Sequence, residues 1–319
     1  MRVALIGYGG VGRAFVRLLD RKRAVFPFRV VGIHTRHGTA ANPAGLHPGV
    51  DLGPAAASAG EFLDRVPCDV VVEVTTLNPA TGEPALSHIR AAFRRHRHAI
   101  TANKGPLAHA YAALCDEARA AGVEFRFEAT VMDGAPLFNT VRNNLPGVEV
   151  LGFTGVLNST TKIVVEAMRD GGSFEDGVAA ARRLGIAEAD ASYDTDGWDS
   201  AAKTAVLANV LMDARKTPLD VDRRGIGRLT LERVRKLAQE RKTVCLVSRA
   251  RRTAAGIRLR VRAEVLDDTD LLASVHGTSN LILFHTDLMG TIGTVSIAPG
   301  VEQTAYGVFS DLVDIAKSV

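Results

Sequence analysis

Five carboxylates lie close together near the middle of a chain that is basic overall. The chain has 319 residues and a net charge of +4, and a lysine follows its acidic run. The residues of this run are Glu188, Asp190, Asp194, Asp196, Asp199 and Lys203. Carboxylates at such short spacing repel one another, so their density is explained if the run binds a cation.

The end of the run also has the pattern of a helix start. Asp196 is in a position to cap a helix, and Asp199 would lie in the first turn, where the helix dipole favours an anion. Asp199 and Lys203 are four residues apart and would share one helix face. An ion pair at this spacing is worth only about 0.2–0.5 kcal/mol, so the pattern also fits a capped helix without chemistry.

Three glycines near the N-terminus have the spacing of a phosphate-binding loop. Gly7, Gly9 and Gly12 form G-x-G-x-x-G directly after an apolar strand and at the start of a helix. The first glycine allows the tight turn, the second lets backbone amides approach a pyrophosphate, and the third lets helix and strand pack closely. The loop, with Gly10 and Val11 inside it, predicts a dinucleotide site.

Residues at two other strand ends bear on the cofactor. The second strand ends in GIHTRHG, where NAD enzymes usually have Asp or Glu for the adenosine ribose. Arg36 instead offers a guanidinium that can pair with a 2′-phosphate, which favours NADP, although an arginine here can also stack on adenine and NAD stays an alternative. Thr75 and Thr76 follow a later strand and are placed to approach a nicotinamide, although threonine also occurs there for turn reasons.

A doubly wound sheet would position these residues. From Arg2 to about Phe138, Val- and Ile-rich strands alternate with amphipathic helices, which indicates a parallel sheet covered on both faces. We expect a Rossmann-type α/β domain over 1–135, whose last strand is VEFRFEATV (123–131). The helix over about 301–319 is apolar along one stripe and is expected to pack back on this domain.

The second half of the chain has the pattern of an α+β domain. Segments such as RLRVRAEVL alternate like half-buried strands, and segments such as WDSAAKTAVLANVLMDA have the apolar spacing of helices. We expect an antiparallel or mixed sheet here and assign 136–300 to a substrate-binding domain.

The composition excludes several classes of protein. With 46% hydrophobic residues the chain can bury a large core, yet no window is apolar enough for a membrane span. Cys68, Cys115 and Cys245 are too few and too scattered for a disulfide framework or a zinc site, which favours the cytoplasm. The basic stretches lack interleaved aromatic residues, so they indicate solvated surface rather than nucleic-acid binding.

Taken together, the motifs resemble those of the homoserine dehydrogenases along essentially the whole chain. LGIAEADASYDTDGWDSAAK is similar to the family's substrate segment, where Gly-x-x-Glu-x-Asp precedes Asp, Gly, another Asp and a lysine four residues later. TANKGPL, EATVMDGAPLFNTVRNNLPG, GVLNSTT, GTSNLILFHTD and PGVEQTAYGVFSDL resemble other parts of the family pattern in the same order.

The resemblance implies reversible, NADP- or NAD-dependent hydride transfer between L-homoserine and L-aspartate 4-semialdehyde, within threonine and methionine biosynthesis. It implies that Lys203 transfers the proton, with Asp199 beside it and Lys104 as a cofactor contact or second acid. By the same resemblance, Glu188, Asp199, Asp194 and Thr160 would bind the substrate, and Gly185 and Gly300 would touch the cofactor.

A lysine suits this chemistry for a physical reason. When hydride reaches an aldehyde carbon, negative charge develops on the oxygen and a proton must arrive there. Asp199 would raise the pKa of Lys203, whereas burial would lower it, so the balance sets the working pH.

The resemblance also implies a monovalent cation such as Na⁺, held by Glu128 and by the carbonyls of Val131, Asp133 and Ala135. It further implies a homodimer formed through the sheet of the second domain. Because the chain ends near the end of the family's core, we expect a short form without the ACT or kinase domain of some relatives.

Two departures from the family pattern leave other functions open. Lys162 stands where the family usually has Asn, and the closing loop has Pro299 in a stiffer Ala-Pro-Gly. The alternatives are a dehydrogenase of a related amino or hydroxy acid, or a cofactor-binding sensor with a decayed site. A phosphorylating aldehyde dehydrogenase is disfavoured, because it needs a nucleophilic cysteine between its domains.

Overall fold

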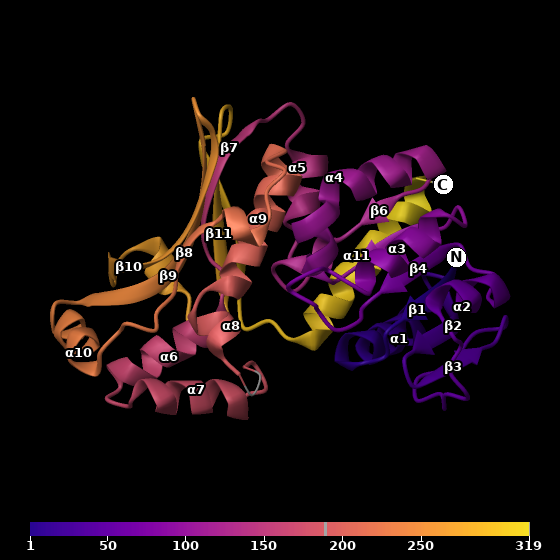
Figure 1. Cartoon of the computed structure of the whole chain (residues 1–319), viewed down its shortest axis with the longest axis horizontal. Helices are drawn as coiled ribbons and strands as arrows, with labels where there is room; N and C mark the ends of the chain where they lie inside the picture. Colours follow the sequence, from indigo (N-terminus) through magenta and orange to yellow (C-terminus); the bar gives the residue numbers. More distant parts are fainter. Residues whose placement is uncertain (188–189, 319) are drawn as a thin grey trace. The chain divides into compact units, whose positions relative to one another are not determined.

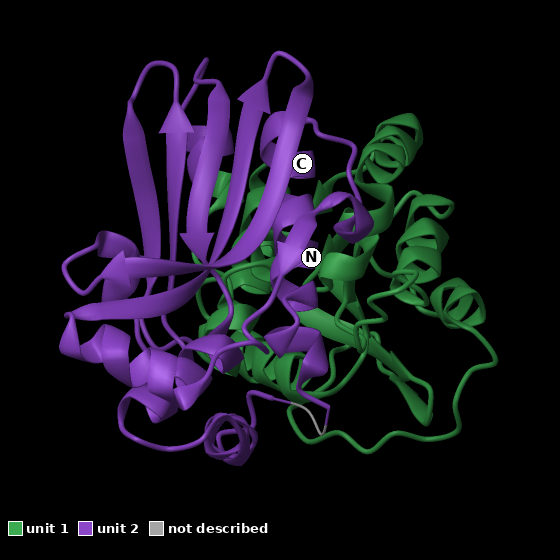
Figure 2. Ribbon diagram, turned by 60° about the vertical axis from the view of Figure 1, so that its left-hand side comes forward, with its two compact units in different colours: residues 1–139, 300–319 green, residues 140–299 purple. Residues whose placement is uncertain are grey.

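The computed structural model describes residues 1–187 and 190–318. Contacts divide the chain into two compact units (Figure 2): Met1–Asn139 together with Gly300–Val319, and Thr140–Pro299. Each unit is built on its own sheet.

Short apolar runs form the central strands of the first unit, and most of their side chains are buried. Strands of a parallel sheet covered on both faces have this character. Among the described residues the sheet has six strands in the order β3-β2-β1-β4-β5-β6 (Figure 1). They are β1 (Arg2–Ile6), β2 (Arg29–Thr35), β3 (Gly38–Ala41), β4 (Val70–Glu73), β5 (His98–Thr101) and β6 (Phe125–Arg126). Neighbours pair in parallel, except that β2 and β3 form an antiparallel hairpin at the edge.

Helices that cover this sheet have one buried stripe each. They are α1 (Gly10–Lys22), α2 (Ala59–Arg65), α3 (Ala85–Phe93), α4 (Lys104–Ala121) and α11 (Val301–Ser318), with the 3₁₀ turn η1 (Glu128–Thr130). The C-terminal helix α11 packs against α1, and its Ala305, Val308, Leu312 and Ile315 belong to the core of the first unit. Helix α5 (Phe138–Asn144) begins in the first unit and ends in the second.

A mixed sheet forms the base of the second unit. Among the described residues it has six strands in the order β12-β11-β7-β9-β10-β8. They are β7 (Val150–Val156), β8 (Asp222–Arg224), β9 (Lys242–Thr253), β10 (Gly256–Asp267), β11 (Asn280–Thr286) and β12 (Thr291–Ser296). All pairs are antiparallel except that of β8 with β10.

The helices of the second unit are α6 (Ser159–Arg169), α7 (Phe174–Arg183), α8 (Ser192–Thr195), α9 (Trp198–Met212) and α10 (Leu231–Gln239), with the 3₁₀ turns η2 (Pro218–Asp220) and η3 (Leu271–Ser274). Helix α9 is buried along most of its length and packs against β7, β9 and β10. In Figure 2 the strands of this sheet face the viewer. Leu272 of η3 and Val275 pack against Cys245 and Val247 of β9.

The predicted fold class is confirmed: a Rossmann-type sheet and a second, largely antiparallel α+β unit. The predicted strand over 123–131 is wrong beyond Arg126, since β6 has two residues and the chain then turns into η1. The turn brings the carboxylate of Glu128 to three backbone N–H groups, those of Leu137, Phe138 and Asn139, at the start of α5. Among the described helices, none has the length and apolar character needed to cross a membrane.

Candidate active site

Asp199 and Lys203 lie one turn apart at the start of α9, and their side chains form an ion pair. Lys203 Nζ is 3.1 Å from Asp199 Oδ2 and donates a hydrogen bond to the carbonyl of Leu157 at 2.6 Å. The two side chains are 15% and 10% exposed, so the pair is largely shielded from water. The predicted position of Asp199 in the first helical turn is confirmed.

Asp194 joins this pair through Asn158 at the end of β7. The side-chain amide of Asn158 donates to Asp194 Oδ1 at 2.8 Å and to Asp199 Oδ2 at 3.0 Å. Thr160 donates its hydroxyl to Asp194 Oδ2 at 2.8 Å. The amide oxygen of Asn158 also caps α6, since it accepts from the N–H of Thr161. One residue therefore fixes the start of α6 and both aspartates.

A left-handed glycine separates the short helix α8, which carries Asp194, from α9, which carries Asp199. Gly197 has φ of 84° and precedes α9, while Asp196 is the C-cap residue that follows α8. The prediction that Asp196 caps α9 is therefore wrong, because no side chain caps that helix. The Arg223 guanidinium lies over the ring of Trp198 and bonds the carbonyl of Asp196, which holds this junction.

The acidic run is thus divided by the fold. Asp194 and Asp199 converge on Asn158, whereas Asp190 and Asp196 are exposed, and Asp190 accepts from the N–H of Ser192. Glu188 lies outside the described residues. Gly185 follows α7 in an exposed turn with φ of 70°.

Burial dominates the electrostatics of the cluster. It raises the pKa of Asp194, and the charge of Asp199 raises it further, against hydrogen bonds from Thr160 and Asn158 and the charge of Lys203. Burial, together with Asp199 and Asp194, also raises the pKa of Tyr193. Two carboxylates next to a single lysine leave a local excess of negative charge, which suits a cationic ligand.

In the first unit, the glycine loop has the geometry of a phosphate cradle. A Cβ on Gly7 would lie 2.6 Å from the carbonyl oxygen of Val74, and one on Gly12 would lie 2.6 Å from that of Gly7. At Gly9, the N-cap of α1, an added Cβ would meet nothing within 4 Å, and no side chain caps the helix. The first N–H groups of α1 therefore suit the anionic pyrophosphate of a dinucleotide.

A buried carboxylate joins the strand ends beside this loop. Glu73 is fully buried and accepts from the backbone N–H of Thr75 at 2.9 Å, from its hydroxyl, and from the hydroxyl of Thr101 at 2.8 Å. His88 Nδ1 lies 3.8 Å from Glu73. The same network fixes the loop after β4, which continues into the exposed Thr76.

Asn103 extends the network to the first residue of α4. Its N–H donates to the Thr101 hydroxyl at 2.9 Å, its side chain donates to the Thr75 carbonyl at 3.4 Å, and it caps α4 through the N–H of Gly105. Lys104 follows directly and begins α4. Thr75 and Lys104, predicted from separate motifs, are therefore held by one set of hydrogen bonds.

Arg36 lies in the tight turn between β2 and β3 and is exposed. Its Nε is 2.8 Å from Nε2 of His37, and Thr35 accepts from the N–H groups of His37 and Gly38. Gly7 donates to the carbonyl of His34, so the carboxyl end of β2 adjoins the glycine loop. This is where a dinucleotide's adenosine ribose lies in such folds.

Gly300 and Val11 are the remaining predicted cofactor contacts. Gly300 precedes α11 and donates its N–H to Gln303, and a Cβ on Gly10 would lie 3.7 Å from Val301. The start of α11 therefore lies next to the start of α1, where Val11 is located.

The residues predicted to hold a monovalent cation occupy a partly buried turn. The Glu128 carboxylate accepts from three backbone N–H groups, and Asp133 has φ of 51° in the loop that follows. The donor chemistry, one carboxylate and loop carbonyls at Val131, Asp133 and Ala135, fits a hard cation. Glu128 also has a structural role without one, because it caps α5.

Sequence reasoning missed three residues that organise the site: Asn158, Glu73 and Asn103. Asn158 and Asn103 each stand between an apolar strand and a helix, which is the ordinary signal of an N-cap. Glu73 ends the apolar run VVVE, where a buried carboxylate must be hydrogen-bonded. Burial raises the pKa of both Cys68 and Cys245 to about 11, so neither is a ready nucleophile.

Comparison with known proteins identifies the family. The homoserine dehydrogenase model matches residues 136–313, more than half of the chain, and the model of the homoserine dehydrogenase NAD binding domain matches 7–128. The chain belongs to the homoserine dehydrogenase family. An NAD(+)-dependent homoserine dehydrogenase of Pseudomonas canavaninivorans is 33% identical, over 99% of this chain and 96% of the relative. A homoserine dehydrogenase of Methanocaldococcus jannaschii is also 33% identical, over 100% of this chain and 99% of the relative.

Solved structures of this homoserine dehydrogenase family agree with the assignment. The crystal structure of homoserine dehydrogenase from Thermoplasma acidophilum has a TM-score of 0.85 at 27% identity and covers 99% of both chains. The similarity thus extends over the sheets of both units.

Proposed function

We propose that this protein is an NAD(P)-dependent homoserine dehydrogenase that interconverts L-homoserine and L-aspartate 4-semialdehyde. Membership of the family along the whole chain supports this activity. The single observation that carries the chemical assignment is the shielded pair of Lys203 and Asp199, joined to Asp194 through Asn158.

In the proposed reaction, Lys203 handles the proton at the substrate's hydroxyl oxygen. Its bond to the Leu157 carbonyl and its contact with Asp199 fix the ammonium in one position, so little reorganisation is needed when the proton moves. Asp199, with Glu188, binds the substrate's ammonium. Thr160 donates its hydroxyl to Asp194, and Asp194 shares the side-chain amide of Asn158 with Asp199, so Thr160 and Asp194 support the position of Asp199. The bound nicotinamide supplies or accepts the hydride.

The first unit would hold the dinucleotide. Backbone N–H groups of Gly9–Gly12 at the start of α1 receive the pyrophosphate. Thr75, Thr76 and Lys104 would approach the nicotinamide, with Gly185 and Gly300 as further cofactor contacts. Arg36 would bind a 2′-phosphate, so NADP is the proposed cofactor and NAD the second choice.

We further infer a homodimer through the face of the second sheet that carries Arg249 and Glu264. Arg249 and Arg260 there both bond Glu264, and Val295 is half exposed, a mixture of polar and apolar groups found in protein interfaces. Light scattering on the purified protein measures the molecular mass in solution, and a monomeric mass at micromolar concentration would refute the homodimer. The described cysteines are all free, which agrees with a proposed cytoplasmic location.

Turnover of homoserine with NAD or NADP tests the proposed function, with absorbance of the reduced cofactor as the readout. Lys203→Met should lower kcat by about 10²–10⁴-fold, because it removes the proton carrier. Lys216→Met is the matched control, because Lys216 also pairs with an aspartate four residues away, at 3.4 Å, but on an exposed surface. Full turnover in Lys203→Met would refute the assignment, and no turnover of homoserine by the unaltered protein would refute the function.

A further inference from the structure

His88, on α3, lies beside the buried carboxylate of Glu73. Its Nδ1 is 3.8 Å from Glu73 Oε1, and the two side chains are 15% and 0% exposed. Nδ1 is itself buried and has no hydrogen-bond partner among the residues that the structure describes. Because a hydrogen bond to this atom would be about 2.7–3.2 Å long, the contact between the two groups is one of charge.

Neutral groups donate the hydrogen bonds described for Glu73. One carboxylate oxygen, Oε1, accepts from the N–H and the hydroxyl of Thr75, and the other, Oε2, accepts from the hydroxyl of Thr101. An ionised carboxylate can accept all three bonds, whereas a protonated one would have to donate a bond itself. The donors carry no charge, so the negative charge of this buried group is left for His88 to balance.

The pair lies next to the loop that is proposed to approach the nicotinamide. Glu73 ends β4, and Thr75, two residues further on, is held by two hydrogen bonds to its carboxylate. Asn103 bonds both the hydroxyl of Thr101 and the carbonyl of Thr75, so the network continues to the start of α4. A ring that contacts Thr75 is therefore separated from the charge of Glu73 by one hydrogen-bonded residue.

The charge of His88 also acts on a second histidine of the first unit. Burial lowers the pKa of His34 at the end of β2, and the charge of His88 lowers it further, against the charge of Glu61. His88 is therefore a source of charge for the interior at the carboxyl ends of these strands.

Most other titratable side chains on the elements that pack against α3 have described partners of their own. These are Glu61 with Arg65, Asp64 with Arg95, Glu117 with Arg90, Asp116 with Arg119, His98 with the N–H of Glu124, and His109 with the carbonyl of Pro79. Lys104, Tyr111 and Cys115 lie on α4 as well. Of these elements' basic groups, His88 is the one described in contact with Glu73.

A charge near a nicotinamide acts differently on the two redox forms of the ring. The oxidised ring carries a positive charge and the reduced ring carries none, so a nearby carboxylate favours binding of the oxidised form. A protonated histidine beside that carboxylate offsets the preference. Histidine is the side chain whose charge ordinarily changes between about pH 5 and pH 8.

We propose that protonated His88 balances the charge of Glu73 and thereby sets the relative affinity of the protein for oxidised and reduced dinucleotide. When His88 loses its proton, the charge of Glu73 is no longer balanced, and the oxidised form binds more tightly relative to the reduced form. His88 touches neither cofactor nor substrate in this role and acts through Glu73. The role rests on the proposed function, because it requires a nicotinamide at Thr75.

Binding measurements without homoserine test this role. Titration of the full chain with NADP⁺ and with NADPH, followed by calorimetry, gives the Kd for NADP⁺ divided by the Kd for NADPH. The ratio should fall about threefold or more between about pH 5.5 and about pH 8.5, as His88 loses its proton. The 2′-phosphate also titrates near about pH 6, but it is present in both forms and cancels in the ratio.

His88→Asn keeps a polar side chain at this position but cannot be protonated. In this variant the ratio should stay at the low value of the unaltered protein at high pH, across the whole pH range. Cooperative thermal unfolding shows that the variant is folded, and the pH series on the unaltered protein tests the role without any substitution.

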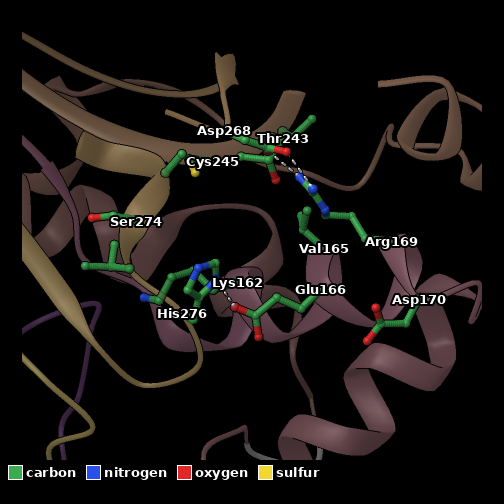
Figure 3. Close-up of a pocket in the computed structure, with 13 residues that line it drawn as sticks. Lys162, Val165, Glu166, Arg169, Asp170, Thr243, Cys245, Asp268, Ser274 and His276 are labelled. Carbon is green, nitrogen blue, oxygen red and sulfur yellow. Dashed lines mark hydrogen bonds and ion pairs between the residues drawn. The ribbon is translucent and has the colours of Figure 1, made fainter. Parts of the chain in front are cut away.

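His276→Asn is the matched control. His276 also faces a glutamate, Glu166, at 3.2 Å, but the pair lies in the second unit and the histidine side chain is 75% exposed (Figure 3). The ratio in this variant should follow the pH dependence of the unaltered protein.

The outcomes separate this role from the proposed function. If both forms bind but their ratio is constant with pH in the unaltered protein, or still changes with pH in His88→Asn, the role of His88 is overturned and the proposed function stands. A loss of the pH dependence in His276→Asn would overturn it as well. If the unaltered protein binds neither NADP nor NAD in either redox form, the proposed function falls together with the role of His88.

Discussion

Asn158 Nδ2 lies 3.0 Å from Asp199 Oδ2. The same nitrogen donates to Asp194, so one neutral amide holds two carboxylates that would otherwise repel each other. Because the amide carries no charge, it positions them without neutralising them. The negative charge therefore stays available for the ammonium of a substrate.

Asn158→Ala should lower kcat/KM for homoserine about 10–100-fold and destabilise the fold. Loss of the cap of α6 accounts for about 1 kcal/mol of stability, and the loss in kcat/KM comes from the two aspartates moving apart. Steady-state kinetics and urea unfolding measure the two effects separately.

Ser173→Ala is the control for that variant. Ser173 caps α7 in the same way, through the N–H of Asp176, but touches neither Asp194 nor Asp199. We expect a similar loss of stability with unchanged kcat/KM. Equal kinetic losses in the two variants would show that Asn158 acts only as a cap.

Asp194 should make the protein lose stability as pH rises above about 4. Its folded-state pKa is raised, by burial first and then by Asp199, so the folded protein keeps the proton to higher pH than the unfolded chain does. Between the ordinary value of 3.8 and the raised pKa, the unfolding free energy of the unaltered protein should fall relative to Asp194→Asn. Above the raised pKa the difference should be constant. Urea unfolding from pH 4 to pH 8 measures it.

For Asp176 we expect the opposite dependence of stability on pH, which Asp176→Asn would remove. Hydrogen bonds from the backbone and hydroxyl of Ser173 lower the pKa of Asp176, so its contribution to stability is present above 3.8 and is lost as pH falls through the lowered value. If the unfolding free energy of the unaltered protein rose with pH relative to that of Asp194→Asn between pH 4 and pH 8, this result would contradict the direction of the Asp194 pKa shift.

Arg36→Ala should change the choice of cofactor. If its guanidinium pairs with the 2′-phosphate, kcat/KM with NADP should fall about 10–100-fold, as expected for a hydrogen bond to a charged group worth about 1.5–3 kcal/mol. Turnover with NAD should change less than threefold. Arg65→Ala, which removes an exposed arginine paired with Glu61 on α2, is the control. Equal losses with the two cofactors would exclude the 2′-phosphate contact.

Glu73→Gln should weaken dinucleotide binding as well as stability. The carboxylate accepts bonds from Thr75 and Thr101, and an amide nitrogen in its place would face donors, at a cost of about 1–3 kcal/mol. Because the network continues to Asn103 and the start of α4, the KM for the dinucleotide should rise severalfold.

Glu117→Gln is the comparison for that variant, because Glu117 pairs with Arg90 on a partly exposed surface. Exposed pairs contribute about 0–1 kcal/mol, so neither its stability nor its KM should change much. A KM for the dinucleotide that is unchanged in Glu73→Gln would leave Glu73 with a purely structural role.

The local pattern of residue types and spacing was enough to predict several features of the structure. The G-x-G-x-x-G spacing after an apolar strand predicted the loop at Gly7–Gly12, and the i,i+4 spacing of Asp199 and Lys203 predicted their ion pair. Both depend on contacts within one or two turns of chain, which residue type and spacing largely decide. The same reasoning failed at Asp196, where a left-handed glycine, rather than the side chain before it, starts the helix.

The sequence by itself determined the two kinds of sheet and the residue types available for chemistry, because hydrophobic periodicity and glycine spacing are local properties. Only the tertiary structure decided that Asp194 and Asp199 share Asn158, 36 and 41 residues away, while Asp190 and Asp196 face solvent. It also decided that Glu73 and Thr101, 28 residues apart, join β4 to β5. Such contacts depend on which strand ends meet in the folded sheet, and no spacing along the chain encodes that meeting.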